Sequence, residues 1–205
     1  MCSQMPCKNI TSCGSSTLTS YERRQVLFLH DREAIRRSSH SPIDKFALFL
    51  SCSHLKKEDP TATSGYYIID PDGEGDLEPF SVYCDMTVKN EVGVTVISHD
   101  SERRTLVTGC EHRGCYSRNI HYTGASLSQL APLTRVSLHC EQFIRYECFG
   151  ARLLKYLSGW WVSRDSTKMR YWGGASPGSG KCACGMNNSC ANPSDGCNCD
   201  EDRHV

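Results

Sequence analysis

Apolar and polar residues alternate along this chain mainly after residue 50. The segments GYYIID (65–70), FSVYCDM (80–86) and VGVTVISHD (92–100) combine β-branched and aromatic residues over the length of a strand. Between the first two, PDGEG (71–75) has the composition of a turn. The pattern therefore predicts a β-hairpin with a polar loop, followed by a third strand.

The second half of the chain predicts one short helix and further strands. ASLSQL (125–130) is typical of a short helix, and the apolar residues of RVSLHCEQFIRYEC (135–148) indicate two strands. GWWVSRDSTKMRYWGG (159–174) predicts another hairpin, with four aromatic residues: Trp160, Trp161, Tyr171 and Trp172. Because alternating aromatic residues in a hairpin usually bury one face, we expect them to pack in a core rather than to stack on a sugar.

The first 50 residues have a different character. Residues 21–40 contain few helix breakers, and charged residues flank a short apolar centre, so this segment predicts a helix. Its apolar residues, 26–29, are consecutive rather than spaced over helical turns, which is also typical of a poorly ordered leader. We therefore divide the chain into an unassigned leader, residues 1–50, and one domain, residues 51–205.

Size and charge narrow the range of functions. A chain of 205 residues with 39% hydrophobic content is long enough to bury one good core. The 23 basic and 23 acidic residues cancel and no basic block occurs, which argues against nucleic acid as a partner. The best apolar run, residues 46–50, is far shorter than the roughly 20 residues of a membrane span. We therefore expect no membrane span in this chain.

Cysteine usage indicates an oxidising compartment. The chain has 14 cysteines, and this density is typical of secreted proteins. Its start, MCSQMPCKNITSC, nevertheless lacks the basic and apolar regions of a signal peptide. Two explanations remain open: the true start lies upstream, or the protein is intracellular and reduced and binds zinc through its thiols.

Five cysteines are concentrated near the C-terminus. They form two C-x-C pairs, Cys182 with Cys184 and Cys197 with Cys199, on either side of Cys190. In an extended segment the two cysteines of C-x-C are roughly 6.6 Å apart and point the same way, so each can bridge to a different strand. Zinc knuckles usually have the spacing C-x2-C. The spacing therefore favours disulfides, with zinc as the alternative.

The acidic turn DPDGEGDLEPFS (70–81) partly matches a calcium-binding loop. Oxygen-bearing side chains recur at alternate positions: Asp70, Asp72, Glu74, Asp76 and Glu78. The twelfth position is Ser81 rather than glutamate, and strands rather than helices are predicted on both sides. We therefore interpret this segment as a solvated acidic turn, with weak calcium binding as the alternative.

The arrangement of polar residues does not indicate catalysis. The sequence has no nucleophile elbow, metalloprotease helix or phosphate-binding glycine loop. His139 lies next to Cys140, but adjacent residues of a strand face opposite ways. We expect no enzymatic activity, no catalytic residue, no metal and no cofactor.

Two Asn-x-Ser/Thr sequons are candidate glycosylation sites, beginning at Asn9 and Asn187. Such triplets often occur by chance, so neither is strong by itself. The second lies within the cysteine-rich segment, and we expect it to be exposed if the chain is secreted.

Five segments form a recognisable series between about Cys52 and Asp200. They are SGYYIIDPDGEGDLEPFSVYCDMT, LHCEQFIRYEC, GWWVSRDS, YWGGASPGSGKCACG and CNCD, in this order. Together they resemble the fibrinogen-like module of the contactin-associated proteins, neuronal cell-surface adhesion receptors of the neurexin superfamily. The spacing C-x-C-G-x4-C-x6-C-x-C after YWGG makes the match specific. GYYIIDPDG and HCEQ also resemble the C-propeptide of fibrillar collagens.

The resemblance implies an α+β, disulfide-rich fold like that of the fibrinogen C-terminal domain, and an extracellular, non-catalytic recognition role. It implies a bridge between Cys52 and Cys84. We expect further disulfides among Cys148, Cys182, Cys184, Cys190, Cys197 and Cys199, and Cys140 is a further candidate disulfide cysteine. Expected partners are cell-surface or extracellular-matrix proteins, and glycans are a further option. The alternatives are a secreted fibrinogen-like lectin, a collagen C-propeptide-like assembly module and a zinc-stabilised intracellular protein.

The chain departs from the family pattern at both ends. Residues 1–50 do not resemble the EGF-like unit expected before the module, and the family module continues beyond CNCD to a closing cysteine. We therefore expect a glycoprotein fragment of a contactin-associated-protein-like membrane receptor, with a domain truncated at its C-terminus. In the related collagen module, the counterpart of Cys140 pairs near the far C-terminus. We therefore expect Cys140 to lack a partner within this chain.

Overall fold

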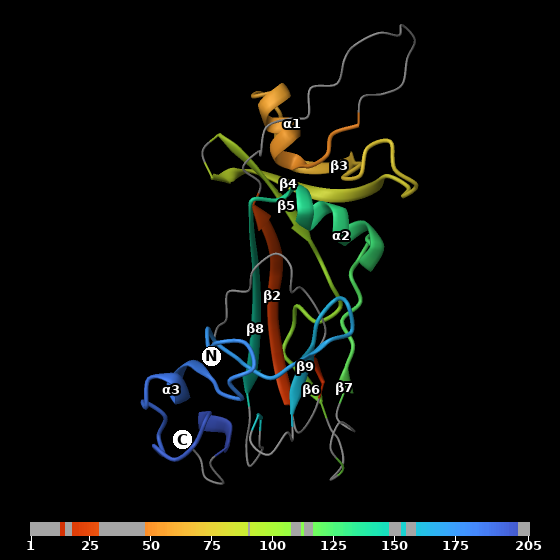
Figure 1. Cartoon of the computed structure of the whole chain (residues 1–205). Coiled ribbons are helices and arrows are strands. Elements are labelled where there is room, and N and C mark those ends of the chain that lie inside the picture. The colour runs from red at the N-terminus through yellow and green to blue at the C-terminus, as the bar shows by residue number, and fades with distance from the viewer. Residues whose placement is uncertain are drawn as a thin grey trace, which may run out of the picture. The chain divides into compact units, whose positions relative to one another are not determined.

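The chain forms two compact units, each assembled from separate stretches of sequence (Figure 1). The computed structural model describes residues 13–14, 18–28, 48–89, 91–107, 112, 117–147, 153–154 and 159–200. Unit 1 comprises Met1–Arg24, His99–His121 and Gln142–Val205, and unit 2 comprises Gln25–Ser98 and Tyr122–Glu141. The division of the chain at residue 50 stays a prediction.

Unit 2 contains an antiparallel sheet built on the predicted hairpin. Its strands are β3 (Gly65–Ile69), β4 (Phe80–Lys89), β5 (Val92–Ile97) and the last residues of β2 (Leu18–Phe28), hydrogen-bonded in that order. Tyr66 lies opposite Tyr83, and Tyr83 lies opposite Val96. The hairpin and the third strand predicted from the alternating pattern are thus confirmed.

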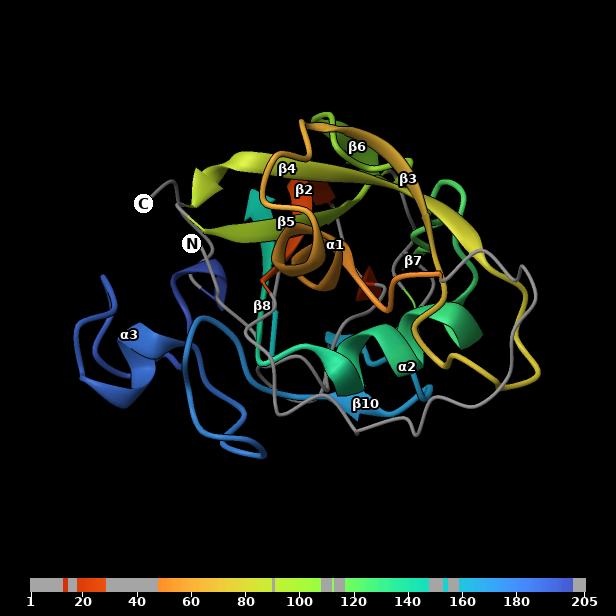
Figure 2. The same cartoon turned by 90° about the horizontal axis from the view of Figure 1, so that it is seen from above.

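Helix α1 (Cys52–Glu58) covers one face of this sheet, against β4 and β5 (Figure 2). The side chain of Ser51 caps the helix by accepting a hydrogen bond from the His54 N–H at 3.1 Å. The helix can approach β5 because Gly93 has no side chain: a Cβ there would lie 2.1 Å from the carbonyl oxygen of Cys52. Residues that alternate along β4 form the core under the helix: Phe80, Val82, Cys84 and Met86.

Helix α2 (Leu127–Val136) also belongs to unit 2, and it extends the short helix that the sequence predicts. A capping box between Ser126 and Gln129 begins the helix, and its inward face buries Leu130 and Leu133. The Gln129 amide also donates to the carbonyl oxygen of Glu78 at 2.7 Å. This bond attaches the first turn of α2 to the acidic turn after β3.

Unit 1 has a second, smaller sheet and most of the cysteine-rich sequence. The sheet is antiparallel, in the order β10 (Lys168–Met169), β9 (Trp160–Val162), β1 (Cys13–Gly14) and β7 (Ser117–Arg118). The first residues of β2 pair with β6 (Thr105–Val107). Helix α3 (Ala183–Met186) and a 3-10 turn at Asn198–Asp200 follow. The predicted hairpin at residues 159–174 is confirmed by the pairing of β9 with β10.

Two secondary-structure predictions are wrong. Residues 21–28 belong to strand β2 rather than to a helix, because their consecutive apolar residues make no helical stripe while the backbone pairs with β5 and β6. Residues 29–40 of that predicted helix lie outside the described residues. In RVSLHCEQFIRYEC, Arg135 and Val136 end α2, and a single strand, β8 (His139–Glu147), replaces the two expected ones.

Candidate functional site

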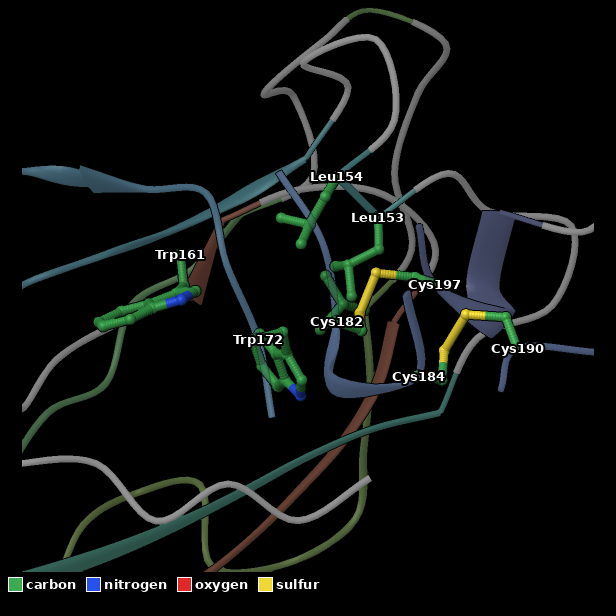
Figure 3. Packing of buried hydrophobic residues seen from close by; sticks show 9 residues of the cluster. Leu153, Leu154, Trp161, Trp172, Cys182, Cys184, Cys190 and Cys197 are labelled. Carbon is green, nitrogen blue, oxygen red and sulfur yellow. A yellow bond between two sulfur atoms is a disulfide. The ribbon is translucent and has the colours of Figure 1, made fainter. Parts of the chain in front are cut away.

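The core of unit 1 is an aromatic cluster in contact with half-cystines (Figure 3). Trp161 and Trp172 are 1% and 3% exposed, and the indole N–H of Trp161 donates to the carbonyl oxygen of Tyr171 at 2.7 Å. The remaining buried members are Val107, Leu153, Leu154, Cys182, Cys184, Cys190 and Cys197. The cluster holds the cysteine-rich segment against the hairpin of β9 and β10.

Two disulfides close this segment on itself. Cys182 is bonded to Cys197, and Cys184 to Cys190. The expectation of an extended C-x-C is wrong here: Cys182 is the N-cap of α3 and Cys184 lies within it. A helical turn rotates successive side chains by about 100°, so the two sulfurs diverge toward different partners.

Backbone hydrogen bonds accompany each bridge. The Cys182 N–H donates to the carbonyl oxygen of Gly196 at 2.9 Å, and the Ser189 N–H donates to that of Cys184 at 2.8 Å. The side-chain oxygen of Asn198 accepts from the Ala191 N–H at 2.9 Å. Covalent and hydrogen bonds together fix the shape of a segment that has little regular secondary structure.

One loop of this segment is exposed on the fixed scaffold, and we call residues 186–189 the sequon loop. Met186 is 43% exposed, and Asn187, Asn188 and Ser189 are exposed as well. Asn187 is the C-cap of α3, and Asn188 adopts a positive φ of 53°. The sequon loop thus presents one exposed apolar side chain beside polar residues, and isolated exposed apolar side chains are common on protein surfaces.

The aromatic residues of the hairpin do not form an open platform. Trp161 is buried, as expected for core packing. The ammonium group of Lys168 lies 4.1 Å from the ring centroid of Trp160, so a cation covers one face of that ring. Sugar stacking on Trp161 is therefore incompatible with this arrangement.

In unit 2, Cys52 and Cys84 are bonded, with a sequence separation of 32 residues. Both are 0% exposed, and the bond joins the first turn of α1 to the centre of β4. This is the pairing implied by the family resemblance.

Cys140 and Cys199 each take part in a disulfide as well. The expectation that Cys140 has no partner within the chain is therefore wrong. That expectation was carried over from the pairing in a related module, whereas this chain contains 14 cysteines with a different distribution. Cys148 and the sequon at Asn9 lie outside the described residues. In a disulfide, sulfur is not the thiolate that zinc binds.

The acidic turn directs its first two carboxylates toward its own backbone. Asp70 accepts from the Gly73 N–H at 3.0 Å, and Asp72 accepts from the Leu77 N–H at 3.2 Å. Burial and the neighbouring Asp72 carboxyl raise the pKa of Asp70. Within the described part of the chain, no three His, Cys, Asp or Glu side chains converge as a metal site would require.

A polar network around Asp100 was not foreseen from the sequence. Its carboxylate lies 3.0 Å from the His121 ring nitrogen Nδ1 and 3.5 Å from the Arg118 guanidinium. Burial by itself raises the pKa of Asp100, but hydrogen bonds from His121 and Ser101, together with Arg118, outweigh it and lower the pKa. Arg118 and His121 lie 18 and 21 positions after Asp100, and no sequence pattern links residues at that spacing.

The same network lacks the geometry of a catalytic triad. The hydroxyl of Ser101 donates to Asp100 at 3.0 Å and accepts from the Arg118 Nε at 2.8 Å. An activated serine would instead donate to a histidine ring nitrogen. The arrangement is suited to fixing loop positions rather than to nucleophilic chemistry.

Comparison with known proteins finds relatives over most of the chain. Human contactin-associated protein 1 is 41% identical over 145 residues, or 69% of this chain, and its mouse counterpart is 42% identical over 144 residues, or 68%. Neurexin-4 of Drosophila melanogaster is 37% identical over 159 residues, or 74%. This chain spans only 10% to 12% of the length of these relatives. No family model and no solved structure matches.

The described elements and bridges define a disulfide-rich module of mixed helices and strands. The similarity over seven tenths of the sequence identifies the module more closely. Over this stretch the chain is a module like that of the contactin-associated proteins of the neurexin superfamily. No helix in the described part of the chain is both long and apolar enough to be a membrane span.

Proposed function

We propose that this chain is an extracellular, non-catalytic recognition module of a cell-adhesion receptor. Its homology to contactin-associated protein 1 and neurexin-4 carries the proposal. The disulfides support an oxidising compartment, because such bonds persist mainly in secreted and cell-surface proteins. A fibrinogen-like fold remains part of the proposal, on the segment pattern of the sequence.

The sequon loop is the proposed contact surface of the module. Met186 supplies an exposed apolar side chain. The bridges Cys182–Cys197 and Cys184–Cys190 restrain the backbone on both sides of the loop. A loop that is rigid before binding loses little conformational entropy when a partner binds. We therefore expect this loop to contribute to affinity without rearranging.

The partner that we propose is a cell-surface protein of the contactin type. The human relative, contactin-associated protein 1, is by its name associated with contactin, and 145 residues of this chain are 41% identical to it. The test uses the whole 205-residue chain, expressed through a secretory pathway, and an immobilised contactin ectodomain in a surface binding assay.

Met186→Glu should weaken this binding by at least roughly tenfold, because a charge would be buried in the contact. Val88→Glu is the matched control, since Val88 is also exposed, at 63%, but lies on β4 of unit 2. If both variants bind contactin as tightly as the wild type does, the sequon loop is not the contact surface. A wild-type chain that is oxidised and folded but does not bind would contradict the proposed partner.

A further inference from the structure

Strand β3 forms one border of the sheet in unit 2 (Figure 2). On one side it pairs with β4, with Tyr66 opposite Tyr83 and Ile68 opposite Ser81. On the other side, the described residues pair with it only at its end, through a parallel bridge between Phe49 and Ile69. Most of this side of β3 is therefore open within the described structure.

The direction of the open backbone groups follows from one hydrogen bond. The Asp70 N–H donates to the carbonyl oxygen of Phe49 at 2.9 Å, so it points away from β4. Alternate residues of a strand direct their N–H and C=O groups to the same side. The backbone groups of Tyr66 and Ile68 therefore also face away from β4. The Ile68 carbonyl lies at the parallel bridge with Phe49, so the groups open to another strand are the N–H and C=O of Tyr66 and the N–H of Ile68.

The side chains of β3 do not prevent another strand from pairing with this border. The strand GYYII contains no charged residue, and Tyr66 and Ile68 are 78% and 57% exposed. Exposed strand borders usually carry charges or proline that prevent pairing. Tyr66 also packs edge to face on Tyr83, with ring centroids 5.4 Å apart, so its ring is already positioned on the outer face.

The charges at the two ends of β3 are complementary. Before the strand, the Lys56 ammonium group lies 2.6 Å from the carbonyl oxygen of Pro60 and 3.4 Å from that of Ala62. After the strand comes the acidic turn, in which Glu74, Asp76 and Glu78 are exposed. The nearby Asp59 carboxylate is engaged by the N–H and hydroxyl of Thr61.

We propose that two copies of this chain associate through antiparallel pairing of their β3 strands. Antiparallel pairing brings the start of each strand to the end of the other, so Lys56 of one copy faces the acidic turn of the second. The same surface serves both copies, as in a two-fold symmetric dimer. This inference does not depend on the proposed adhesive role.

The register of this pairing places Tyr66 opposite Tyr66 of the second copy. The Asp70 N–H is already used by Phe49, so a pairing centred further along the strand would lack a donor. A pairing centred on Tyr66 lets the two tyrosines exchange their N–H and C=O bonds. Their rings then continue the aromatic row that Tyr66 and Tyr83 begin on each sheet.

Sedimentation equilibrium of the oxidised 205-residue chain tests this inference. Over roughly a hundredfold range of concentration, the wild type should pass from monomer to dimer, as mass action requires. Tyr66→Pro removes the open N–H without touching a group that faces β4, and it should weaken dimerisation by at least about tenfold. Tyr66→Thr keeps that N–H and should weaken it less.

Charge reversal provides a second test outside the strand. Lys56→Glu and Asp76→Lys should each weaken dimerisation, and the double variant should restore it, because the opposite charges then face each other again. Mapping of the Cys52–Cys84 bridge in every variant confirms that unit 2 has folded. A wild type that stays monomeric, or a folded Tyr66→Pro variant that dimerises normally, would overturn the proposal. So would a double variant that is no better than the single ones.

Discussion

The backbone of Gly185 lies so close to that of Gly196 that no side chain fits between them. A Cβ on Gly185 would be 2.2 Å from the carbonyl oxygen of Gly196, well inside any permitted contact. That same oxygen accepts the hydrogen bond from the Cys182 N–H. The close approach therefore belongs to the arrangement that brings Cys182 to Cys197.

Gly185→Ala should destabilise unit 1 by roughly 1 to 3 kcal/mol, because the added methyl group forces two backbone segments apart. Thermal or urea unfolding measures the loss. Gly65→Ala is the matched control, since a Cβ at Gly65 would meet only a Tyr67 ring carbon at 3.8 Å. Equal effects of the two substitutions would show that the approach of Gly185 to Gly196 has no special role.

The two C-terminal bridges should differ in their contribution to stability. The bond Cys182–Cys197 spans 15 residues and Cys184–Cys190 spans 6. In the chain-entropy model these correspond to about 3 and about 2 kcal/mol.

Replacing each pair by serine, Cys182→Ser with Cys197→Ser and Cys184→Ser with Cys190→Ser, should therefore lower the urea midpoint more for the longer loop. The reverse order would mean that native packing, rather than loop closure, decides the outcome. All four of these cysteines belong to the hydrophobic cluster, so both double variants place polar groups in that core.

Asp100 should make the stability of unit 1 sensitive to acid. Its folded-state pKa is lowered, so its contribution is fully present above the unfolded value of about 4 and is lost as the pH falls through the folded value. Asp100→Asn should flatten the decline in unfolding free energy below about pH 4. Chemical unfolding at a series of pH values measures this. A decline as steep in the variant as in the wild type would assign the acid sensitivity to other carboxyl groups.

Local sequence patterns predicted the hairpins well, because the residues that determine a hairpin are close together in the sequence. Alternation along GYYIID and FSVYCDM specifies which face of each strand is buried, and the turn residues between them specify the connection. Strand β2 was missed, because its pairing with β5 and β6 involves residues roughly seventy to ninety positions away. Tertiary pairing outweighs local helix preference in such a segment.

The cysteine-rich segment could be recognised from the sequence, but its disulfide pairing and backbone conformation could not be predicted. The C-x-C spacing correctly suggested that Cys182 and Cys184 bridge to different partners, but it assumed an extended backbone. The helical turn of α3 contains Gly185, whose backbone closely approaches that of Gly196, a contact that no local pattern encodes. For the same reason, the network of Asp100 with Arg118 and His121 was invisible before the fold was known.

Secretory expression should attach an N-glycan to Asn187, so the contact proposed for the neighbouring Met186 is measured in the Asn187→Gln background, where no glycan adjoins it. The Asn187 side chain is exposed in the sequon loop, and Ser189 completes the acceptor triplet. Treatment with an endoglycosidase should reduce the mass of the wild-type chain by one more glycan than that of an Asn187→Gln variant. Identical mass shifts would show that the sequon is not used. Ser189→Ala should behave like Asn187→Gln, because it removes the acceptor triplet without changing the asparagine.

The extracellular, disulfide-bonded nature of the module is tested most directly by mapping its bridges. The 205-residue chain, secreted and alkylated without reduction, should give linked peptides for Cys52–Cys84, Cys182–Cys197 and Cys184–Cys190 in mass spectrometry. Free, alkylated Cys182, Cys184, Cys190 and Cys197 in a folded chain that holds stoichiometric zinc would contradict the account and favour an intracellular zinc protein.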